Sequence, residues 1–159
     1  ESPTVARGWP CALTVPRELS MRGGKLCQWP AHEIERMRGD CVRATGGETV
    51  EEPGRLFDLV VSCEGAKIVE LEIRKGVFVR YADGMLTLDM GDEGYGRDQR
   101  SIELSELRDL RVLSDTTMVE IFANSGEAAL TSRTYSPAVS AMGLHAEGAA
   151  SMDFYRLAH

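Results

Sequence analysis

Short runs of alternating apolar and polar residues, each bounded by turn residues, follow one another from Arg55 to the end of the chain. A period of two places successive side chains on opposite faces of a strand, so each run predicts a half-buried β-strand. About nine runs of this kind, with almost no helical pattern, favour an all-β fold. In the run Lys67–Arg74, the expected buried face carries Val69, Leu71 and Ile73, and the expected wet face carries Glu70, Glu72 and Arg74.

Two of the turns have a composition that favours positive backbone φ angles. Asp83-Gly84 separates the runs 77–82 and 85–90 and suits a two-residue type I′ turn. Asn124-Ser125-Gly126 separates two further apolar runs and predicts a second hairpin. Successive hairpins predict an antiparallel two-layer β-sandwich, jelly-roll-like or concanavalin-like, with a closed barrel as the alternative.

The first part of the chain follows a different pattern, because it holds five of the six prolines and two Gly-Gly pairs. Short strands are expected at Cys11–Val15 and Lys25–Gln28, joined by the turn Arg22–Gly24. A short helix is expected over Pro30–Gly39, which has proline near its first turn, acids early, arginine late and glycine at its end. The boundary with the sandwich is expected near residues 48–54.

Composition and charge exclude several function classes. A formal net charge of -7 and an acidic pI near 5.0 disfavour nucleic acid, because phosphate binding needs a basic surface. The chain lacks the run of about 18 apolar residues that a membrane-spanning helix requires. The usage of Arg, Gly and Ala is typical of a bacterial protein. We therefore expect a cytoplasmic protein, or an extracellular one if an upstream signal has been removed.

Cysteine and histidine spacing indicates no metal or cofactor. The four cysteines stand 14 to 22 residues apart without a C-x-x-C pair, so reduced and partly buried thiols are favoured over disulfides. The histidines His32, His145 and His159 are scattered along the chain and have no ligand spacing. We expect no metal site and no cofactor.

Two groups of residues carry a resemblance to a known family. The first is Gly8–Ser20, followed by Gly24–Gln28 and the Glu-Ile-Glu-Arg-Met-Arg helix. The second comprises Leu110–Asp115, Val119–Phe122, Gly126-Glu127, Thr131–Arg133 and Tyr135. In order and spacing, both resemble glycoside hydrolase family 32, the invertases, sucrose-6-phosphate hydrolases and fructan hydrolases. Pro10-Cys11 and Trp29 depart from the usual pattern of the linker.

The resemblance implies a retaining fructosidase whose Asp nucleophile and Glu acid/base stand about 5 Å apart in a five-bladed propeller. The motifs that hold them in this family, W-M-N-D-P-N-G, R-D-P and E-C, do not occur in this chain. Arg97-Asp98 and Arg108-Asp109 lack the proline of the R-D-P motif. We therefore expect no catalytic residue here and no activity of the chain alone.

The resemblance also implies a division of the chain and a structural role. Residues 1–30 correspond to the tail of the propeller and the linker, 31–47 to a linker with a short helix, and 48–159 to the C-terminal sandwich. The expected role is to brace the propeller, with homo-oligomer contacts as a further possibility. The candidate interdomain contacts are Trp9, Leu13, Val15 and Leu19. A free-standing, lectin-like carbohydrate-binding module is the alternative, although the aromatic residues are spread along the chain.

Overall fold

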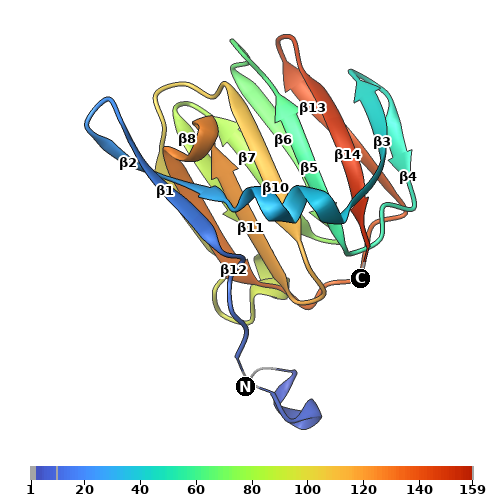
Figure 1. The fold of residues 1–159 in the computed structure, drawn as a ribbon. Coiled ribbons are helices and arrows are strands. Elements are labelled where there is room, and N and C mark those ends of the chain that lie inside the picture. The colour runs from blue at the N-terminus through green and yellow to red at the C-terminus, as the bar shows by residue number, and fades with distance from the viewer. Residues whose placement is uncertain (1–2, 10, 159) are drawn as a thin grey trace.

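Two antiparallel six-stranded sheets stack face to face in the computed structural model, which describes residues 3–9 and 11–158 (Figure 1). The first sheet has the order β12-β11-β10-β5-β14-β3 and comprises β3 (Arg38–Thr45), β5 (Phe57–Ser62), β10 (Asp109–Ser114), β11 (Met118–Ala123), β12 (Ala128–Arg133) and β14 (Ser151–Leu157). The second has the order β4-β13-β6-β7-β8-β9 and comprises β4 (Thr49–Glu51), β6 (Ile68–Arg74), β7 (Val77–Ala82), β8 (Met85–Asp89), β9 (Gln99–Glu103) and β13 (Ala141–Glu147). The predicted all-β sandwich is confirmed.

The core lies between the sheets and is built from alternate residues of the strands. On β6 the side chains of Val69, Leu71 and Ile73 are buried, as the two-residue period predicts. They face apolar side chains from the first sheet, among which the rings of Phe57 and Phe154 lie 5.4 Å apart. Alternation in the sequence therefore identified the inner face correctly.

Arg74 was expected on the wet face of β6, and that expectation was wrong. The register between β6 and β7 shifts between Glu72 and Arg74, so the alternation breaks at this point. The Arg74 guanidinium is fully buried and donates to Ser114 Oγ (2.8 Å), the Arg55 carbonyl (3.1 Å) and the Ser136 carbonyl (3.2 Å). Burial, with Arg55 nearby, lowers the Arg74 pKa to about 10.

Both predicted hairpins are present. Asp83 and Gly84 have φ angles of 51° and 73° between β7 and β8, as a type I′ turn requires. β11 and β12 pair from Met118↔Arg133 to Ala123↔Ala128. The turn between them contains the short 3₁₀ segment η4 (Asn124–Gly126), in which all three residues have positive φ.

The N-terminal part differs from the expectation at two places. Cys11–Val15 forms no strand; the partner of β2 (Lys25–Pro30) is instead β1 (Arg17–Arg22), with Gly23 and Gly24 in the turn. The short helix is present as the 3₁₀ helix η2 (His32–Met37). β3 follows η2 directly and pairs with β14, so part of the expected linker range 31–47 is an edge strand of the sandwich.

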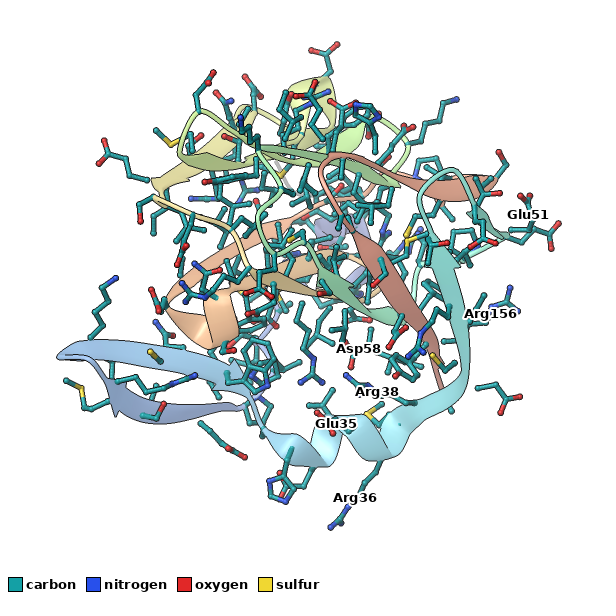
Figure 2. The ribbon with its side chains drawn as sticks, turned by 90° about the horizontal axis from the view of Figure 1, so that it is seen from above. Glu35, Arg36, Arg38, Glu51, Asp58 and Arg156 are labelled. Atoms are coloured by element: carbon teal, nitrogen blue, oxygen red, sulfur yellow. The ribbon has the colours of Figure 1, made fainter. Side chains whose placement is uncertain are left out.

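The hairpin β1–β2 and η2, residues 17–37, lie across the outer face of the first sheet, and we call this segment the strap. Figure 2, turned by 90° from Figure 1, shows the strap as a third layer on the outer side of the first sheet. Upstream of it, the short 3₁₀ helix η1 (Val5–Arg7) lies beyond one end of the sandwich (Figure 1). Among the described residues, no helix is long and apolar enough to cross a membrane.

Candidate functional site

Charged side chains occupy the outer face of the first sheet, and the strap buries them. Asp58 on β5, Arg111 on β10 and Glu120 on β11 each stand between apolar neighbours in the sequence. The alternating pattern placed such residues on a wet face, but each is at most 2% exposed. The strands β10 and β11 are therefore buried on both faces, and a buried charge needs a partner.

Asp58 is the centre of the larger of two ion-pair groups. Its carboxylate accepts from Arg111 Nε (3.0 Å) and Nη2 (2.8 Å) and from Arg38 Nε (2.7 Å). Glu35 of η2 lies 3.3 Å from Arg111 and so brings a second carboxylate to the pair of guanidiniums. Figure 2 shows Asp58, Arg38 and Glu35 between the sheet and η2, whereas Arg36 points away. These contacts fix η2 on the sheet.

Glu120 is the centre of the second group and holds the start of β1. Its Oε2 accepts from Arg17 Nη2 at 2.6 Å, and its Oε1 accepts from the backbone N–H of Val15 at 2.8 Å. Arg17 also donates to Thr131 Oγ1 at 2.8 Å and to Gln28 Oε1 at 3.0 Å. One buried carboxylate therefore binds both a strap side chain and the backbone that leads into the strap.

Aromatic contacts fill the space between the two ion-pair groups. Trp29 of β2 packs edge to face on Phe122 of β11, with ring centroids 6.0 Å apart. The guanidiniums of Arg111 and Arg17 lie over Trp29 and Phe122, at 5.5 Å and 5.0 Å from the centroids. Trp29, which departs from the usual family pattern, is thus a contact between the strap and the sandwich.

The turn of the β11–β12 hairpin touches the backbone of the strap. A Cβ added to Gly126 would lie 2.2 Å from the carbonyl oxygen of Gln28, and Gly126 has a φ of 94°. Glycine is required here for both reasons. Beside it, Glu127 pairs with Lys25 (3.2 Å) and Arg108 (2.9 Å), which hold the pKa of that carboxyl below its usual range.

The four predicted contact residues lie at the start of the strap or just before it. Leu13 is 93% exposed and Leu19 is 66% exposed. Trp9 is 37% exposed, and Arg133 lies over its ring at 5.4 Å. Val15 is partly buried beside Glu120. Leu13 and Val15 therefore line a common cavity, whereas Trp9 contacts Arg133 and Leu19 lies on β1.

An apolar cavity of about 270 Å³ opens between the strap and the first sheet. Leu13 and Val15 line it from the segment before β1, and Ile34 and Met37 line it from η2. Its floor is formed by residues of the sandwich, including Leu56, Leu113, Met118 and Leu157. Leu13 lines this cavity and is at the same time exposed to solvent.

The two Arg-Asp pairs considered as catalytic relics have structural contacts. Asp109 Oδ1 accepts from the backbone N–H of Ser125 at 2.7 Å and so holds the β11–β12 turn. Arg108 binds Glu127, as described above. Asp98 lies in the connection before β9, where its carbonyl accepts from the N–H of Met90 at 2.7 Å. Among the described residues, these acids do not converge on a common point.

Aromatic residues gather at a second place, near the N-terminal end of the chain. Tyr95 and Tyr135 pack at right angles with centroids 5.4 Å apart, and Arg133 lies between Tyr135 (5.3 Å) and Trp9 (5.4 Å). Tyr95 is 55% exposed. Sequence patterns did not predict this group, because its three aromatic residues are separated by about 40 residues or more and meet only through long-range packing.

Comparison with known proteins defines the family. A family model described as "Glycosyl hydrolases family 32 C terminal" matches residues 77–157, more than half of the chain. The chain belongs to glycoside hydrolase family 32. A raffinose invertase of Escherichia coli is 36% identical over 151 residues, which cover 84% of this chain and 31% of the relative. A sucrose-6-phosphate hydrolase of Salmonella typhimurium is 31% identical over 147 residues, covering 87% of this chain and 29% of the relative.

Solved structures of the family share the fold. A sucrose-6-phosphate hydrolase from Lactobacillus gasseri superposes with a TM-score of 0.85 at 17% identity, covering 99% of this chain and 36% of that chain. An exo-inulinase from Aspergillus awamori gives a TM-score of 0.72 at 18% identity, covering 91% and 35%. The family 32 chain described here spans just under a third of the length of the curated relatives it matches.

Proposed function

We propose that this chain is the linker and C-terminal sandwich of a retaining β-fructofuranosidase-like hydrolase, and that it braces the catalytic propeller. Its relatives include a raffinose invertase and sucrose-6-phosphate hydrolases, so the substrate of the whole protein is proposed to be sucrose, sucrose 6-phosphate or a fructan. One observation supports the bracing role above all others. The strap is held on the sandwich by ion pairs to the buried side chains of Arg111 and Glu120, yet it exposes large apolar side chains.

The exposed apolar side chains are the proposed contact with the propeller. Leu13, Leu19 and Met21 are at least 66% exposed, and the strap that carries the latter two is fixed to Arg111 through Glu35 and to Glu120 through Arg17. Burying one such side chain stabilises an interface by about 1.5–3 kcal/mol. Because the strap is held in place before the partner docks, little conformational entropy is lost on docking. A fixed apolar surface of this kind suits a rigid joint between two domains.

The chain's chemical contribution is then positional. In a retaining mechanism the carboxylate that attacks the sugar and the acid that protonates the leaving group must keep their separation. In this proposal both groups belong to the propeller, and the sandwich limits the movement of its last blade. Two copies of the chain could also associate through the same exposed residues, and sedimentation of the isolated chain measures that association.

The experiment compares two substitutions in a full-length protein that contains this chain. Leu19→Asp should lower the temperature at which the enzyme loses its activity of releasing fructose from sucrose, because it places a charge in the proposed contact. Val42→Asp is the matched control, since Val42 is an exposed apolar residue on β3, the edge strand at the far side of the first sheet from β11 and β12 and outside the strap. The isolated chain should release no fructose. Equal effects of both substitutions, or turnover by the isolated chain that is lost on changing Asp98 or Asp109, would contradict the proposal.

Sugar binding is the second candidate function, and the aromatic group of Trp9, Tyr95 and Tyr135 favours it. Exposed rings can stack on the C–H face of a sugar, and the partly exposed Tyr95 offers such a surface. Titration of the isolated chain with fructose and sucrose, followed by tryptophan fluorescence, tests this function. Saturable binding that is lost in Tyr95→Ala would favour the lectin-like module over the bracing role.

A further inference from the structure

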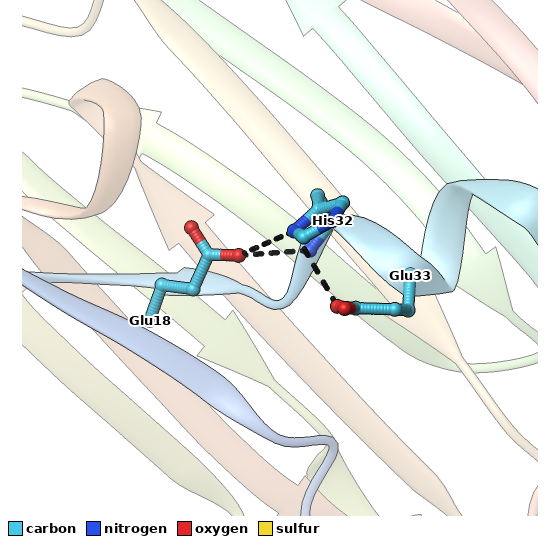
Figure 3. Close-up of side chains that lie close together, drawn as sticks. All are labelled: Glu18, His32 and Glu33. Carbon is cyan, nitrogen blue, oxygen red and sulfur yellow. Dashed lines mark hydrogen bonds and ion pairs between the residues drawn. The ribbon is translucent and has the colours of Figure 1, made fainter.

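Three side chains of the types that can ligate a metal ion meet at the joint between β1 and η2. His32 Nδ1 lies 2.9 Å from Glu18 Oε1 and 3.4 Å from Glu33 Oε2 (Figure 3). The three ligand atoms all lie within 4.8 Å of one another. Glu18 precedes His32 by 14 residues, so the sequence spacing did not reveal this group. All three side chains are exposed and therefore accessible to an ion from solvent.

The strap fixes the backbone on both sides of this group. Within the β1–β2 hairpin, Glu18 pairs with Trp29, which packs on the sandwich. After Pro30, the N–H of Ala31 donates to the carbonyl of Pro16 at 2.9 Å, which holds the start of η2 beside β1. The backbone N–H of His32 also donates to Glu18 Oε1 at 3.1 Å. This bond positions the Glu18 carboxylate independently of the imidazole.

Two of the three separations between the side-chain atoms match those of ligands around one small metal ion. Two ligand atoms that each lie about 2.0–2.1 Å from zinc stand about 2.9 Å apart at a right angle and about 3.4 Å apart at a tetrahedral angle. The observed values from His32 Nδ1 to the two carboxylates are 2.9 Å and 3.4 Å. Small rotations of the exposed carboxylates would place one ion in contact with all three atoms.

The charges of the group also attract a divalent cation, which competes with the proton on His32 Nδ1. One hydrogen on His32 Nδ1 faces two carboxylates and can be donated to only one of them at full strength. A divalent ion would neutralise both Glu18 and Glu33 while the neutral imidazole supplies a nitrogen ligand. Arg36, on the solvent side of η2 (Figure 2), opposes the ion by its charge, whereas the two carboxylates attract it.

We propose that Glu18, His32 and Glu33 form a binding site for a divalent transition-metal ion of the zinc class. One nitrogen and two oxygen ligands leave at least one coordination position for water. Bound there, the ion joins β1 to the start of η2 and so strengthens the strap at the point where the hairpin meets the helix. The site does not depend on the proposed function, because all three ligands belong to this chain.

Calorimetric titration of the intact chain with ZnCl₂ and NiCl₂ tests the site, with MgCl₂ as the control ion. The measurements use the variant Cys11→Ser/Cys41→Ser as background, because these two cysteines are exposed and thiolates also bind zinc. One ion should bind per chain. His32→Ala and Glu18→Gln should each weaken binding at least about tenfold, since even the loss of an outer-shell partner costs 10–100-fold. His145→Ala, which removes an exposed histidine on β13, should leave binding unchanged.

Several outcomes separate the site from adventitious binding. Circular dichroism of each variant checks that the sandwich is folded. Zinc should also raise the melting temperature of the background variant and not that of the folded His32→Ala variant. Absence of saturable zinc binding would overturn the proposal. So would equal affinity in His32→Ala and the background, or loss of binding in His145→Ala.

Discussion

Removal of the negative charge at Asp58 should destabilise the chain strongly. In Asp58→Asn the amide oxygen can accept from one guanidinium, but the amide NH₂ then faces donors of Arg111 or Arg38. The Arg111 side chain is only 1% exposed and cannot recover its hydration. Breaking a buried ion pair by removal of one partner costs about 3–5 kcal/mol.

The structure favours the lower end of that range. Arg38 is 18% exposed and lies over the ring of Tyr155 at 4.3 Å, so it keeps part of its environment. Arg111 keeps Glu35 at 3.3 Å. We therefore expect a loss of about 3 kcal/mol in the free energy of unfolding, which lowers the melting temperature by about 6–12 °C for a chain of this size.

Asp153→Asn is the matched control. Asp153 lies on the same outer face, on β14, and accepts two hydrogen bonds from Arg43 at 2.7 and 2.9 Å. Arg43 is 71% exposed, so the pair should contribute less than about 1 kcal/mol. Urea unfolding followed by circular dichroism measures both variants. If Asp58→Asn destabilises the chain no more than Asp153→Asn, the burial of the outer face under the strap is wrong.

A double substitution separates the buried charge from packing. Asp58→Leu/Arg111→Met removes both members of the pair and replaces them by apolar side chains. It should be less destabilised than Asp58→Asn although it changes more atoms, because the fully buried Arg111 charge is removed together with its partner and only the partly exposed Arg38 loses Asp58. A larger loss in the double variant would indicate that shape, and not charge pairing, dominates at this site.

Three further predictions follow from local contacts. Gly126→Ala should lower the free energy of unfolding by about 2–3 kcal/mol or more, because it combines a positive φ with a clash against Gln28. Gly65→Ala is the control, since Gly65 has a φ of 77° but open space around it, and urea titration should show only the smaller loss from φ strain. A thiol reagent at pH 8 should modify two thiols quickly in the native chain and all four only in denaturant. Two of the cysteines are buried, and burial raises the Cys63 pKa to about 12. Fast modification of four thiols in the native chain would contradict this. The ion pairs of Glu127 lower its pKa and so stabilise the fold above the unfolded pKa of about 4.3; this stabilisation is lost as the pH falls through the lower folded value. Between pH 7 and pH 3, the Glu127→Gln variant should therefore lose less stability than the native chain. An equal loss in both would exclude the pairing.

The sandwich could be predicted from the sequence because its information is local. Alternation in β6 and glycine at the Asp83-Gly84 turn each define an element without reference to distant residues. The register shift next to Arg74 could not be predicted, since the bulge depends on pairing with β7. The edge strand β3 was also missed, because its residues are mostly exposed and its alternation is weak.

The contacts beneath the strap could not be predicted for a different reason. Arg111 and Glu120 stand at positions where alternation alone predicts a wet face. Their partners Asp58 and Arg17 are 53 and 103 residues away in the chain, so only the folded structure brings them together. The signal that could have found them is a charged residue within an otherwise apolar run, combined with the resemblance of the same segments to a known family.

Whether the strap and the sandwich form one body is tested most directly by the fluorescence of Trp29. In a Trp9→Phe variant Trp29 is the single tryptophan, and it extends from the strap to contact Phe122 and Arg111 of the first sheet. Its emission should be blue-shifted and protected from acrylamide, and it should change in the same urea transition as the circular dichroism of the sandwich. A Trp29 quenched as strongly as free tryptophan while the sandwich is still folded would contradict a fixed strap.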